Sequence, residues 1–442
     1  MVTPRPKVCP VGYSQRVHLT MPSDTVEVKV ASHVNEHRLW DRLMQLAKIG
    51  ATQSGGVSRF ALSEEESLAR RLLIEWASEL ELEISTDDIC NLYFRLNGTD
   101  KQAAPVMSGS HIDSQPNGGK FDGAFGVVAA LEVLQAIRES GTQPDRSIDA
   151  VVWLNEEGSR FSPGMMGSDV FVGRRSLKDC LTVKDSKGVS VAEALEATHS
   201  EFQSLPKRSF STPVCHYVEA HIEQGPLLDA AKIPVGVVTG IQGSRRFRIR
   251  VIGEQAHAGT EPMENRKDAL FTAVDVIQEI RSQLMNRYPD LKLTMGLFEI
   301  LPNAPSVVPS SAFFSIDIRH PKDSVLAESR RIISQICDSN QKKCEIEVDQ
   351  IAESESLEFP DSIRQRITRC AEILNISSMP IYSMAGHDAR QMHYHCPSGM
   401  IFVPCYRGIS HSDKEACESS NLFMGTQVLA ASLINMANQQ VN

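Results

Sequence analysis

Histidines and carboxylic acids recur along this chain in short stretches rich in glycine or serine. A pair of divalent ions needs imidazole and carboxylate ligands, one carboxylate that can bridge the ions, and one unligated carboxylate to handle the proton of an attacking water. The chain supplies each of these parts, which predicts a two-metal hydrolase. The predicted metal ligands are His111, Asp122, Glu157, His221 and His411.

The first of these stretches places His111 two residues before Asp113, with Asp122 and Gly123 further along. If one ring nitrogen of His111 binds metal, Asp113 could hold the other nitrogen and raise its basicity. Asp122 could bridge two ions, because a carboxylate just before a helix is oriented by the free amides there. Taken alone, the stretch is equally consistent with a polar turn and a capping aspartate.

Two adjacent glutamates, Glu156 and Glu157, follow the apolar run 151–154. Paired carboxylates at a buried strand end repel each other, and a nearby cation would offset that cost. We assign Glu157 as a metal ligand and Glu156 as the general base that takes the proton of the water. A solvated turn is the common alternative for an isolated Glu-Glu pair.

Two further histidines complete the set. His221 stands shortly before a Gly-Pro break, and His411 lies between serines after the apolar run 400–403. A lone histidine is more often structural than a ligand, so these assignments depend on the other stretches. Neutral imidazoles suit zinc, manganese and similar ions.

Composition limits the classes of protein to consider. A chain of 442 residues is longer than a single domain with one hydrophobic core usually is, which predicts two or three compact units. The formal net charge of −10 makes nucleic acid an improbable partner. The opening residues carry several prolines and charges without the apolar run of a signal peptide, and no stretch has the length of a membrane span, so we expect a cytoplasmic protein without membrane contact. Ten scattered cysteines without a C-x-x-C pair predict reduced thiols.

The elements that must position the ligands alternate between helices and short apolar runs. Helices are expected over 34–50, from Ser63 in a capping box with Glu66, and over 123–140. Leu68, Leu72 and Trp76 should face inward from the second helix. Strands are expected before Ser108 and over 148–154. This alternation predicts an α/β fold whose mixed, mostly parallel sheet is covered by helices, with the ligands at the carboxyl ends of strands.

A second unit is expected from about 243 to 351, where strands and helices follow in the order β-α-β-β-α-β of a ferredoxin-like sandwich. Phe247, Ile249 and Val251 mark its first strand, and Leu270, Val274 and Ile277 its first helix. The catalytic unit would then comprise residues 31–242 and 352–442, after an N-terminal extension, residues 1–30.

At these residues the chain resembles the amidohydrolase branch of the M20 metallopeptidases, which includes N-carbamoyl-L-amino acid hydrolases, allantoate amidohydrolases and β-ureidopropionases of the yeast type. The matching stretches occur in family order over most of residues 35–430. They are GSHIDSQPNGGKFDGAFGV, NEEGSRF, YVEAHIEQGP, GEQAHAGTEPM, DIRHP, AGHDA and GISHS.

The resemblance implies a metallopeptidase-like catalytic domain with two divalent ions per subunit, zinc or manganese, with cobalt or nickel as further candidates. It places His111, Asp122 and His221 around one ion, and Asp122, Glu157 and His411 around the other, with Glu156 as general base. It makes residues 243–351 a lid that also forms a homodimer. It further implies that His257 binds the carbonyl oxygen, reaching across from a partner subunit, that Arg319 binds the substrate carboxylate, and that Gln224 and His387 line the pocket.

The resemblance has one notable departure. Related lids commonly read Asn-Val-Ile-Pro, whereas this chain has Ser306 at the first position, so a hydroxyl replaces an amide that would bind substrate. Gln115 and the Arg-His-Pro at 319–321 are closer to the β-ureidopropionase type than to the allantoate type.

We therefore expect hydrolysis of the C–N bond of a linear N-carbamoyl (ureido) amino acid, including β-ureidopropionate-type substrates, to amino acid, carbon dioxide and ammonia. Three alternatives stay open. They are an allantoate amidohydrolase, an aminoacylase or dipeptidase that cleaves an ordinary amide, and a non-catalytic protein that binds a small ligand on the same fold.

Overall fold

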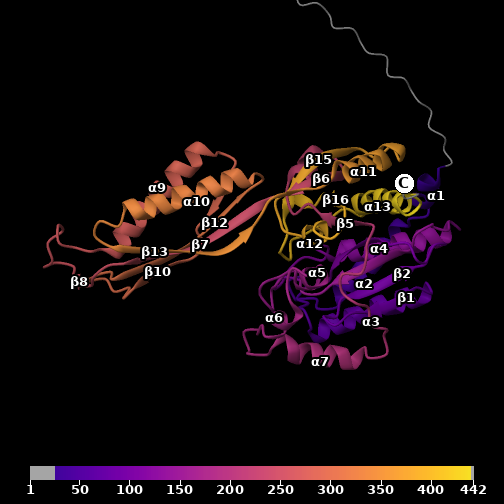
Figure 1. Ribbon diagram of the computed structural model, residues 1–442, viewed down its shortest axis with the longest axis horizontal. Helices are drawn as coiled ribbons and strands as arrows, with labels where there is room; N and C mark the ends of the chain where they lie inside the picture. The colour runs from indigo at the N-terminus through magenta and orange to yellow at the C-terminus, as the bar shows by residue number, and fades with distance from the viewer. Residues whose placement is uncertain (1–24, 440–442) are drawn as a thin grey trace, which may run out of the picture.

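The computed structural model describes residues 25–439, which form two bodies arranged along the long axis of the molecule (Figure 1). The larger body is built on a nine-stranded sheet and the smaller on a five-stranded sheet. Most of the expected N-terminal extension lies outside the described residues. Its last part belongs to helix α1 (Val26–Ala31), which packs on the C-terminal helix of the larger body.

The nine-stranded sheet is mixed, and its central strands are parallel. The spatial order is β1-β2-β4-β3-β5-β16-β6-β14, with β15 also paired to β6. Strand β3 is parallel to β4 and β5, and β16 is parallel to β5, so the carboxyl ends of these four neighbours share one edge. The strands are β1 (Glu83–Thr86), β2 (Leu92–Leu96), β3 (Val106–His111), β4 (Ile148–Trp153), β5 (His216–Ile222), β6 (Val235–Ile241), β14 (Leu357–Glu358), β15 (Ser378–Ser383) and β16 (Ser398–Val403).

Two helices of this body are almost wholly buried. Helix α4 follows β3 and begins at Gly123, and it packs against the sheet and against the C-terminal helix α13. The apolar run predicted over 123–140 is thus a core helix, not an amphipathic surface helix. The helices are α2 (Glu36–Lys48), α3 (Glu64–Glu79), α4 (Ala124–Glu139), α5 (Met166–Phe171), α6 (Leu177–Leu181), α7 (Val191–Glu201), α8 (Leu227–Ala231), α11 (Asp361–Ile373), α12 (Asp388–His393) and α13 (Ser419–Ala437), with a 3-10 turn η1 (Tyr406–Gly408).

Helix α3 starts where the sequence predicts, although two details differ. Ser63 caps the helix by accepting from the Glu66 N–H, but the Glu66 carboxylate accepts from the N–H of Leu62 instead of closing a capping box. The inward face also differs, because Leu68 is 42% exposed while Leu73 and Trp76 are buried. The buried face of α3 also carries Glu66 and Arg70, which form an ion pair at 3.2 Å.

The smaller body follows the predicted β-α-β-β-α-β order with one difference, because the second strand is interrupted and forms β9 and β10, which both pair with β12. Its antiparallel sheet runs β10-β12-β7-β13, with β9 paired to β12, and both of its long helices contact the sheet. Together with the mixed sheet of the larger body, this order confirms the predicted fold class. The elements are β7 (Gly243–Ile252), α9 (Ala269–Arg287), β9 (Lys292–Thr294), β10 (Phe298–Leu301), β12 (Ser311–His320), α10 (Asp323–Ser339) and β13 (Glu345–Ser354), with a separate two-stranded antiparallel sheet of β8 (Ala256–His257) and β11 (Val307–Val308).

The smaller body has a hydrophobic core of its own. Phe247, Ile249 and Val251 of β7 are buried there as predicted. The buried stripe of α9 differs from the prediction, because Val274 is 37% exposed whereas Ala273 lies at the centre of the stripe.

The chain crosses between the bodies twice, at neighbouring points. It leaves the larger sheet after β6 through Gln242 and returns after β13 through residues 355–356. The guanidinium of Arg390, on α12, donates to the main-chain oxygens of both Gln242 and Glu355. One buried side chain therefore ties the two crossings to the larger body.

A membrane-crossing helix would need at least 18 sufficiently apolar residues, and residues 25–439 contain no helix that meets this requirement.

Candidate metal centre and active site

The predicted metal ligands lie together at one edge of the larger sheet. His111 is the last residue of β3, and His221 is the penultimate residue of β5. Glu157 follows β4, and His411 lies in the loop after β16. Because these four strands are parallel neighbours, their ends bring together residues that are up to 300 positions apart in sequence.

Two groups of three side chains could each hold an ion. Ligand atoms of His111, Asp122 and His221 lie within 4.8 Å of one another, as do those of Asp122, Glu157 and His411. Asp122 belongs to both groups: its Oδ1 lies 3.2 Å from His221 Nε2, and its Oδ2 lies 3.2 Å from His411 Nε2. A carboxylate with one oxygen toward each group has the geometry of a bridge between two ions.

Gly123 allows this close arrangement. Its φ is +65°, and a Cβ at this position would lie 2.3 Å from the ring of His111. Its N–H donates to His221 Nε2 at 3.2 Å, while His221 Nδ1 lies 2.9 Å from the Ile222 carbonyl, to which it donates. The Nδ1–H tautomer leaves Nε2 with a lone pair facing Asp122, as a metal ligand requires.

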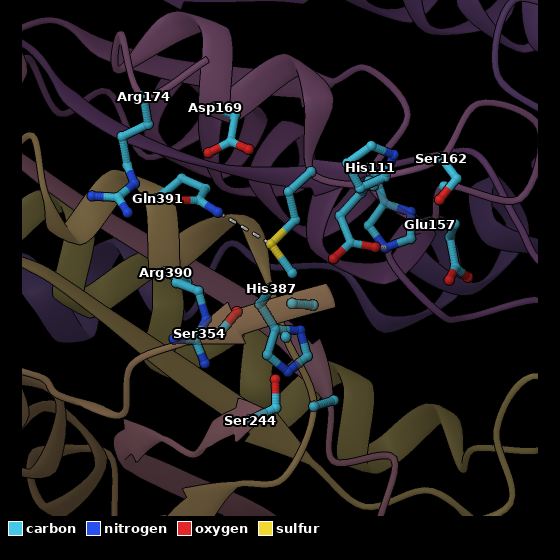
Figure 2. Close-up of a pocket in the computed structure, with 18 of the residues that line it drawn as sticks. His111, Glu157, Ser162, Asp169, Arg174, Ser244, Ser354, His387, Arg390 and Gln391 are labelled. Carbon is cyan, nitrogen blue, oxygen red and sulfur yellow. Dashed lines mark hydrogen bonds and ion pairs between the residues drawn. The ribbon is translucent and has the colours of Figure 1, made fainter. Parts of the chain in front are cut away.

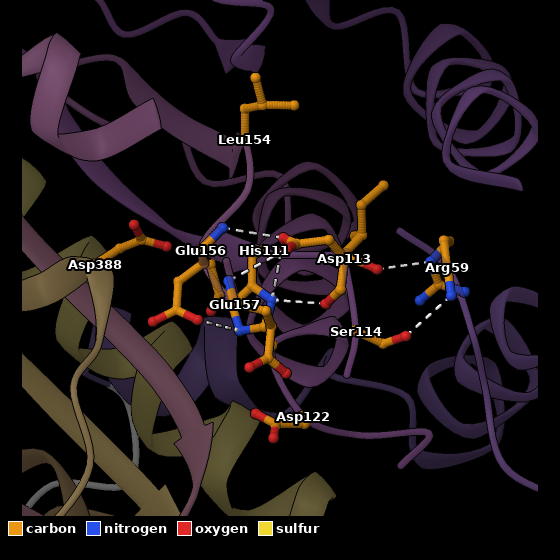
Figure 3. Close-up of polar contacts among 12 residues, drawn as sticks. Arg59, His111, Asp113, Ser114, Asp122, Leu154, Glu156, Glu157 and Asp388 are labelled. Atoms are coloured by element: carbon orange, nitrogen blue, oxygen red, sulfur yellow. Dashed lines mark hydrogen bonds and ion pairs between the residues drawn. The ribbon is translucent and has the colours of Figure 1, made fainter. Parts of the chain in front are cut away.

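The contacts of Asp113 differ from the expected ones. Its main-chain oxygen, not its carboxylate, accepts from His111 Nδ1 at 2.9 Å, and the carboxylate Oδ1 stands 3.6 Å from that nitrogen. The two carboxylate oxygens instead accept from the N–H groups of Glu156 and Glu157, each at 3.1 Å (Figure 3). The side chain of Asp113 thus fixes the turn that carries both glutamates.

Glu156 faces the first ligand group without belonging to it. Its Oε2 lies 3.6 Å from His111 Nε2, and Figure 3 shows its carboxylate between His111 and Asp388. Burial raises the pKa of Glu156 well above its usual value, although His111 opposes the rise. A carboxyl group with a raised pKa beside the ligand cluster is placed to accept and return a proton.

The chemistry of this cluster fits divalent cations. In the part of the chain that the structure describes, the carboxylates of Asp122, Glu156 and Glu157 form ion pairs with histidines and none with lysine or arginine. Burial and the neighbouring Asp122 raise the pKa of Glu157 to about 7. Cations held by this mixed nitrogen and oxygen donor set would offset the repulsion, and imidazole with carboxylate suits zinc, manganese, cobalt or nickel.

Amide side chains complete the surroundings of the second group. Gln224 Nε2 donates to Asp122 Oδ2 at 2.7 Å, and its Oε1 is buried without a hydrogen-bond partner among the described residues. Gln115 Nε2 donates to Glu157 Oε2 at 2.8 Å. Gln224 therefore lies at the site as predicted, while Gln115 supports a candidate ligand.

Sequence reasoning missed two buried glutamates. Glu219 accepts from Ser110 Oγ at 2.7 Å and from the N–H of Ala389 at 2.8 Å, and it lies with His221 and His387 in a third cluster of potential ligand atoms. Its spacing of two from His221 on one strand would have revealed it, because alternate residues share a face. Glu415, which contacts the backbone of Asp122, carries no such signal.

A cavity of about 1050 Å³ extends from the ligand cluster across to the smaller body. His387 lines it, with its ring centroid 4.5 Å from that of His221, and burial holds the pKa of His387 well below its usual value. Arg319 also lines the cavity, from β12, where it forms an ion pair with Asp317 at 2.9 Å.

Two predicted site residues lie elsewhere. His257 is on β8 and Ser306 directly precedes β11, and both residues are exposed; the two-stranded sheet of β8 and β11 lies at the far end of the smaller body (Figure 1). Neither lines the cavity of the same chain. The expected contact of His257 and Ser306 with substrate therefore requires a second chain or a large movement.

Comparisons with known proteins agree with this architecture. Residues 107–435 match the model of the family described as peptidase family M20/M25/M40. An N-carbamoyl-L-amino-acid amidohydrolase from Pseudomonas sp. (strain NS671) is 36% identical over 91% of this chain and 98% of its own length. An allantoate amidohydrolase from Bacillus subtilis (strain 168) is 34% identical over 91% of this chain and 98% of its own length. A crystal structure of an amidase of the hydantoinase/carbamoylase family from Burkholderia multivorans has a TM-score of 0.83 at 37% identity, covering 92% of this chain and 99% of that one.

Proposed function

Since the chain belongs to peptidase family M20/M25/M40 and is a hydrolase of that family, we propose that it hydrolyses the C–N bond of a linear N-carbamoyl amino acid. The products would be the amino acid, carbon dioxide and ammonia. The position of Asp122 between the two ligand groups, with Glu156 beside them, is the observation that carries the proposal. The names of the similar amidohydrolases support the choice of bond.

The metal roles follow the two groups. His111, Asp122 and His221 would hold one divalent ion, and Asp122, Glu157 and His411 the other. When bound, zinc or manganese, or in their place cobalt or nickel, would polarise the carbamoyl oxygen and make water more acidic. Gln224 and Gln115 would keep Asp122 and Glu157 oriented as ligands through their amide hydrogen bonds.

Glu156 would move the proton. Its carboxylate takes a proton from the water that attacks the carbamoyl carbon and returns it to the nitrogen that leaves. The N–H groups of Glu156 and Glu157 donate to Asp113, so the turn is held while this proton is transferred. Asp113 is thus a positioning residue in this scheme.

Residues of the smaller body would bind the substrate. Arg319 offers a planar guanidinium to the substrate carboxylate, and lid closure would bring it nearer the ligand cluster. His257 would donate to the carbamoyl oxygen as charge develops, with Ser306 beside it. Gln224 and His387 would complete the pocket around the carbamoyl group.

Because His257 lies outside the cavity of its own chain, we propose that a partner subunit supplies it in a homodimer. Exposed apolar side chains on the smaller body support this proposal. Phe271 on α9 is 57% exposed, and Phe298 and Leu301 on β10 are 44% and 62% exposed. Strand β10 is also at an edge of the five-stranded sheet, where its backbone could pair with a second copy. Sedimentation equilibrium of wild type and Leu301→Glu would test the dimer, which the variant should weaken.

The test of the reaction is ammonia release from N-carbamoyl-α-amino acids, N-carbamoyl-β-alanine and allantoate, with manganese, zinc or cobalt supplied. Ammonia from a carbamoyl acid supports the proposal. Turnover of acyl amino acids or dipeptides without ammonia would identify an aminoacylase or dipeptidase, and binding without turnover on every substrate would identify a ligand-binding protein.

Hydrolysis of allantoate is the second candidate. The allantoate amidohydrolase of Bacillus subtilis is 34% identical to this chain, within the range of 31% to 36% for the N-carbamoyl relatives. Gln115 and the Arg-His-Pro at 319–321 favour the carbamoyl substrate. Ammonia released from allantoate faster than from every carbamoyl acid would reverse this order.

A further inference from the structure

The cavity continues past the ligand cluster to a wall that the proposed reaction does not use. Figure 2 shows Arg174, Asp169 and Gln391 on one side of the cavity and His111 and Glu157 on the other. A volume of about 1050 Å³ slightly exceeds the range for sites that hold drug-sized ligands, roughly 300–1,000 Å³. A small carbamoyl amino acid at the ligand cluster would leave the far wall free.

Five arginines line the cavity, and four of them have their guanidinium groups engaged. Arg175 forms an ion pair with Asp169 at 2.8 Å, and Arg246 and Arg319 both form ion pairs with Asp317 at 2.9 Å. The fourth, Arg390 on α12, donates to the main-chain oxygens of Gln242 and Glu355. These groups already have partners in the chain.

Arg174 is the exception. Across residues 25–439 its guanidinium makes no ion pair and no hydrogen bond, although its Cζ lies 3.9 Å from the centre of the Tyr394 ring. A planar guanidinium stacked on an aromatic face keeps its in-plane N–H donors free, and two of them can bind one carboxylate. Tyr394 therefore holds Arg174 in place without neutralising it.

The backbone also holds Arg174 in position. Its N–H donates to the carbonyl oxygen of Asp169 in α5 at 2.9 Å, immediately after the turn at Gly173, whose φ is +76°. Helix α5 is joined to α12 by the hydrogen bond from Ser168 Oγ to the Asp388 carboxylate, and Tyr394 is the first residue after α12. Arg174 and Tyr394 therefore each closely follow one of two helices that are connected by a hydrogen bond.

We propose that Arg174 binds a second carboxylate, on the side chain of the substrate, and that the enzyme prefers N-carbamoyl derivatives of acidic amino acids. The proposal rests on the proposed function, because it assigns Arg319 to the common carboxylate and the ligand cluster to the carbamoyl group. Arg174 is then a specificity-determining residue, and Tyr394 is a positioning residue that acts through it.

The test compares substrates that differ in charge and little in shape. Values of kcat/KM for ammonia release are measured with N-carbamoyl-L-glutamate against N-carbamoyl-L-glutamine, and with the aspartate and asparagine derivatives. Charge-assisted hydrogen bonds predict that wild type prefers the acids by about 10- to 100-fold. Arg174→Gln should remove that preference through KM while changing the amide substrates by less than about twofold.

Further variants separate a binding role from a structural one. Tyr394→Phe should keep the acid preference, whereas Tyr394→Ala should lose most of it. Arg287→Gln is the control for loss of an arginine outside the cavity, because Arg287 lies over the ring of Tyr288 at 5.6 Å and pairs with Glu328 at 3.1 Å. This control should leave all four kcat/KM values unchanged.

Two results would overturn the subsite. One is a wild type without preference for the acids. The other is an Arg174→Gln variant whose kcat/KM falls equally for acidic and neutral substrates. That result would mean that Arg174 binds the α-carboxylate that all four substrates share. If wild type releases ammonia from none of the four, the proposed function fails. Calorimetric binding of the glutamate and glutamine derivatives to wild type and Arg174→Gln then still decides the subsite.

Discussion

Glu415 accepts a hydrogen bond from the main-chain N–H of Asp122 at 3.2 Å, across nearly 300 residues of sequence. The same oxygen accepts from the N–H of Phe121 at 2.8 Å, and the other accepts from Ser410 Oγ at 3.2 Å. Ser410 Oγ also lies 2.9 Å from Asp122 Oδ2, so its one hydrogen is shared between the two carboxylates. Glu415 therefore positions both the candidate bridging carboxylate and the loop that carries His411.

Replacing Glu415 with Gln should weaken metal binding by about 10- to 100-fold, the usual effect of removing a group that orients a ligand. The amide would present a donor where two backbone N–H groups need an acceptor. Metal content after dialysis against defined free zinc measures the effect. Glu418→Gln is the control, because Glu418 is exposed in the same segment. Equal metal content in the two variants would contradict the role of Glu415.

Replacing Glu156 with Gln should lower kcat by about 10²- to 10⁴-fold, because the proton acceptor is lost. The metal content should stay that of wild type, since Glu156 lies outside both ligand groups. Glu157→Gln provides the contrast and should lose metal along with activity. Elemental analysis beside ammonia release distinguishes the two, and a Glu156→Gln variant with ordinary turnover would remove Glu156 as the base.

Chelation should lower the stability of the protein as well as its activity. A ligand that binds only the folded state at 100 times its Kd adds about 2.7 kcal/mol to the free energy of unfolding. We expect Tm to fall with EDTA and to recover with manganese or zinc. Asp122→Asn weakens both groups of metal ligands, so the fall in Tm on adding EDTA should be much smaller in this variant. An equal shift in this variant would place the stabilising metal elsewhere.

Removing the guanidinium of Arg390 should destabilise the fold. Arg390→Met leaves the carbonyls of Gln242 and Glu355 without their donor, and each unpaired buried group costs about 1–3 kcal/mol. Urea unfolding should show the lower free energy of unfolding. Arg71→Met is the control: Arg71 is 59% exposed and its ion pair with Glu201 contributes at most about 1 kcal/mol. Similar losses in the two variants would argue against a special role for Arg390.

Two inactive variants should restore activity when mixed, if His257 acts across the dimer. In a 1:1 mixture of Glu156→Gln and His257→Ala chains, random exchange gives heterodimers in half of the population. Each heterodimer would have one intact site, so about a quarter of wild-type activity is expected for a symmetric dimer. Ammonia release after subunit exchange checks this, and a mixture no more active than its components would exclude the arrangement.

The sequence could predict the ligands, because each is a chemically distinctive residue next to a recognisable strand end. His111 and Glu157 follow apolar runs whose ends must meet if the strands are parallel neighbours. The contacts of Asp113 could not be predicted in this way. Whether its carboxylate or its carbonyl reaches His111 depends on the turn that carries Glu156, and spacing does not determine that conformation.

The sequence is equally limited in predicting which face of a helix is buried. The apolar pattern located α3 but not its inward face, because Leu68 is exposed while Leu73 packs in the core. The Glu66–Arg70 ion pair lies on the same buried face, and apolar spacing does not reveal such a polar contact. Glu415 was missed for a related reason. Its partners come from a distant part of the chain, and nothing in its own segment indicates them.

The pairing of Leu357 with Ile241 has an evolutionary consequence. The chain departs from the larger sheet and rejoins it at adjacent positions, so the segment between behaves as a module inserted at one point. Such a segment could be exchanged, lengthened or lost without altering the order of strands that assembles the metal ligands. The residues of the smaller body that we propose to bind the substrate could therefore diversify independently of the metal ligands and Glu156 in the larger body.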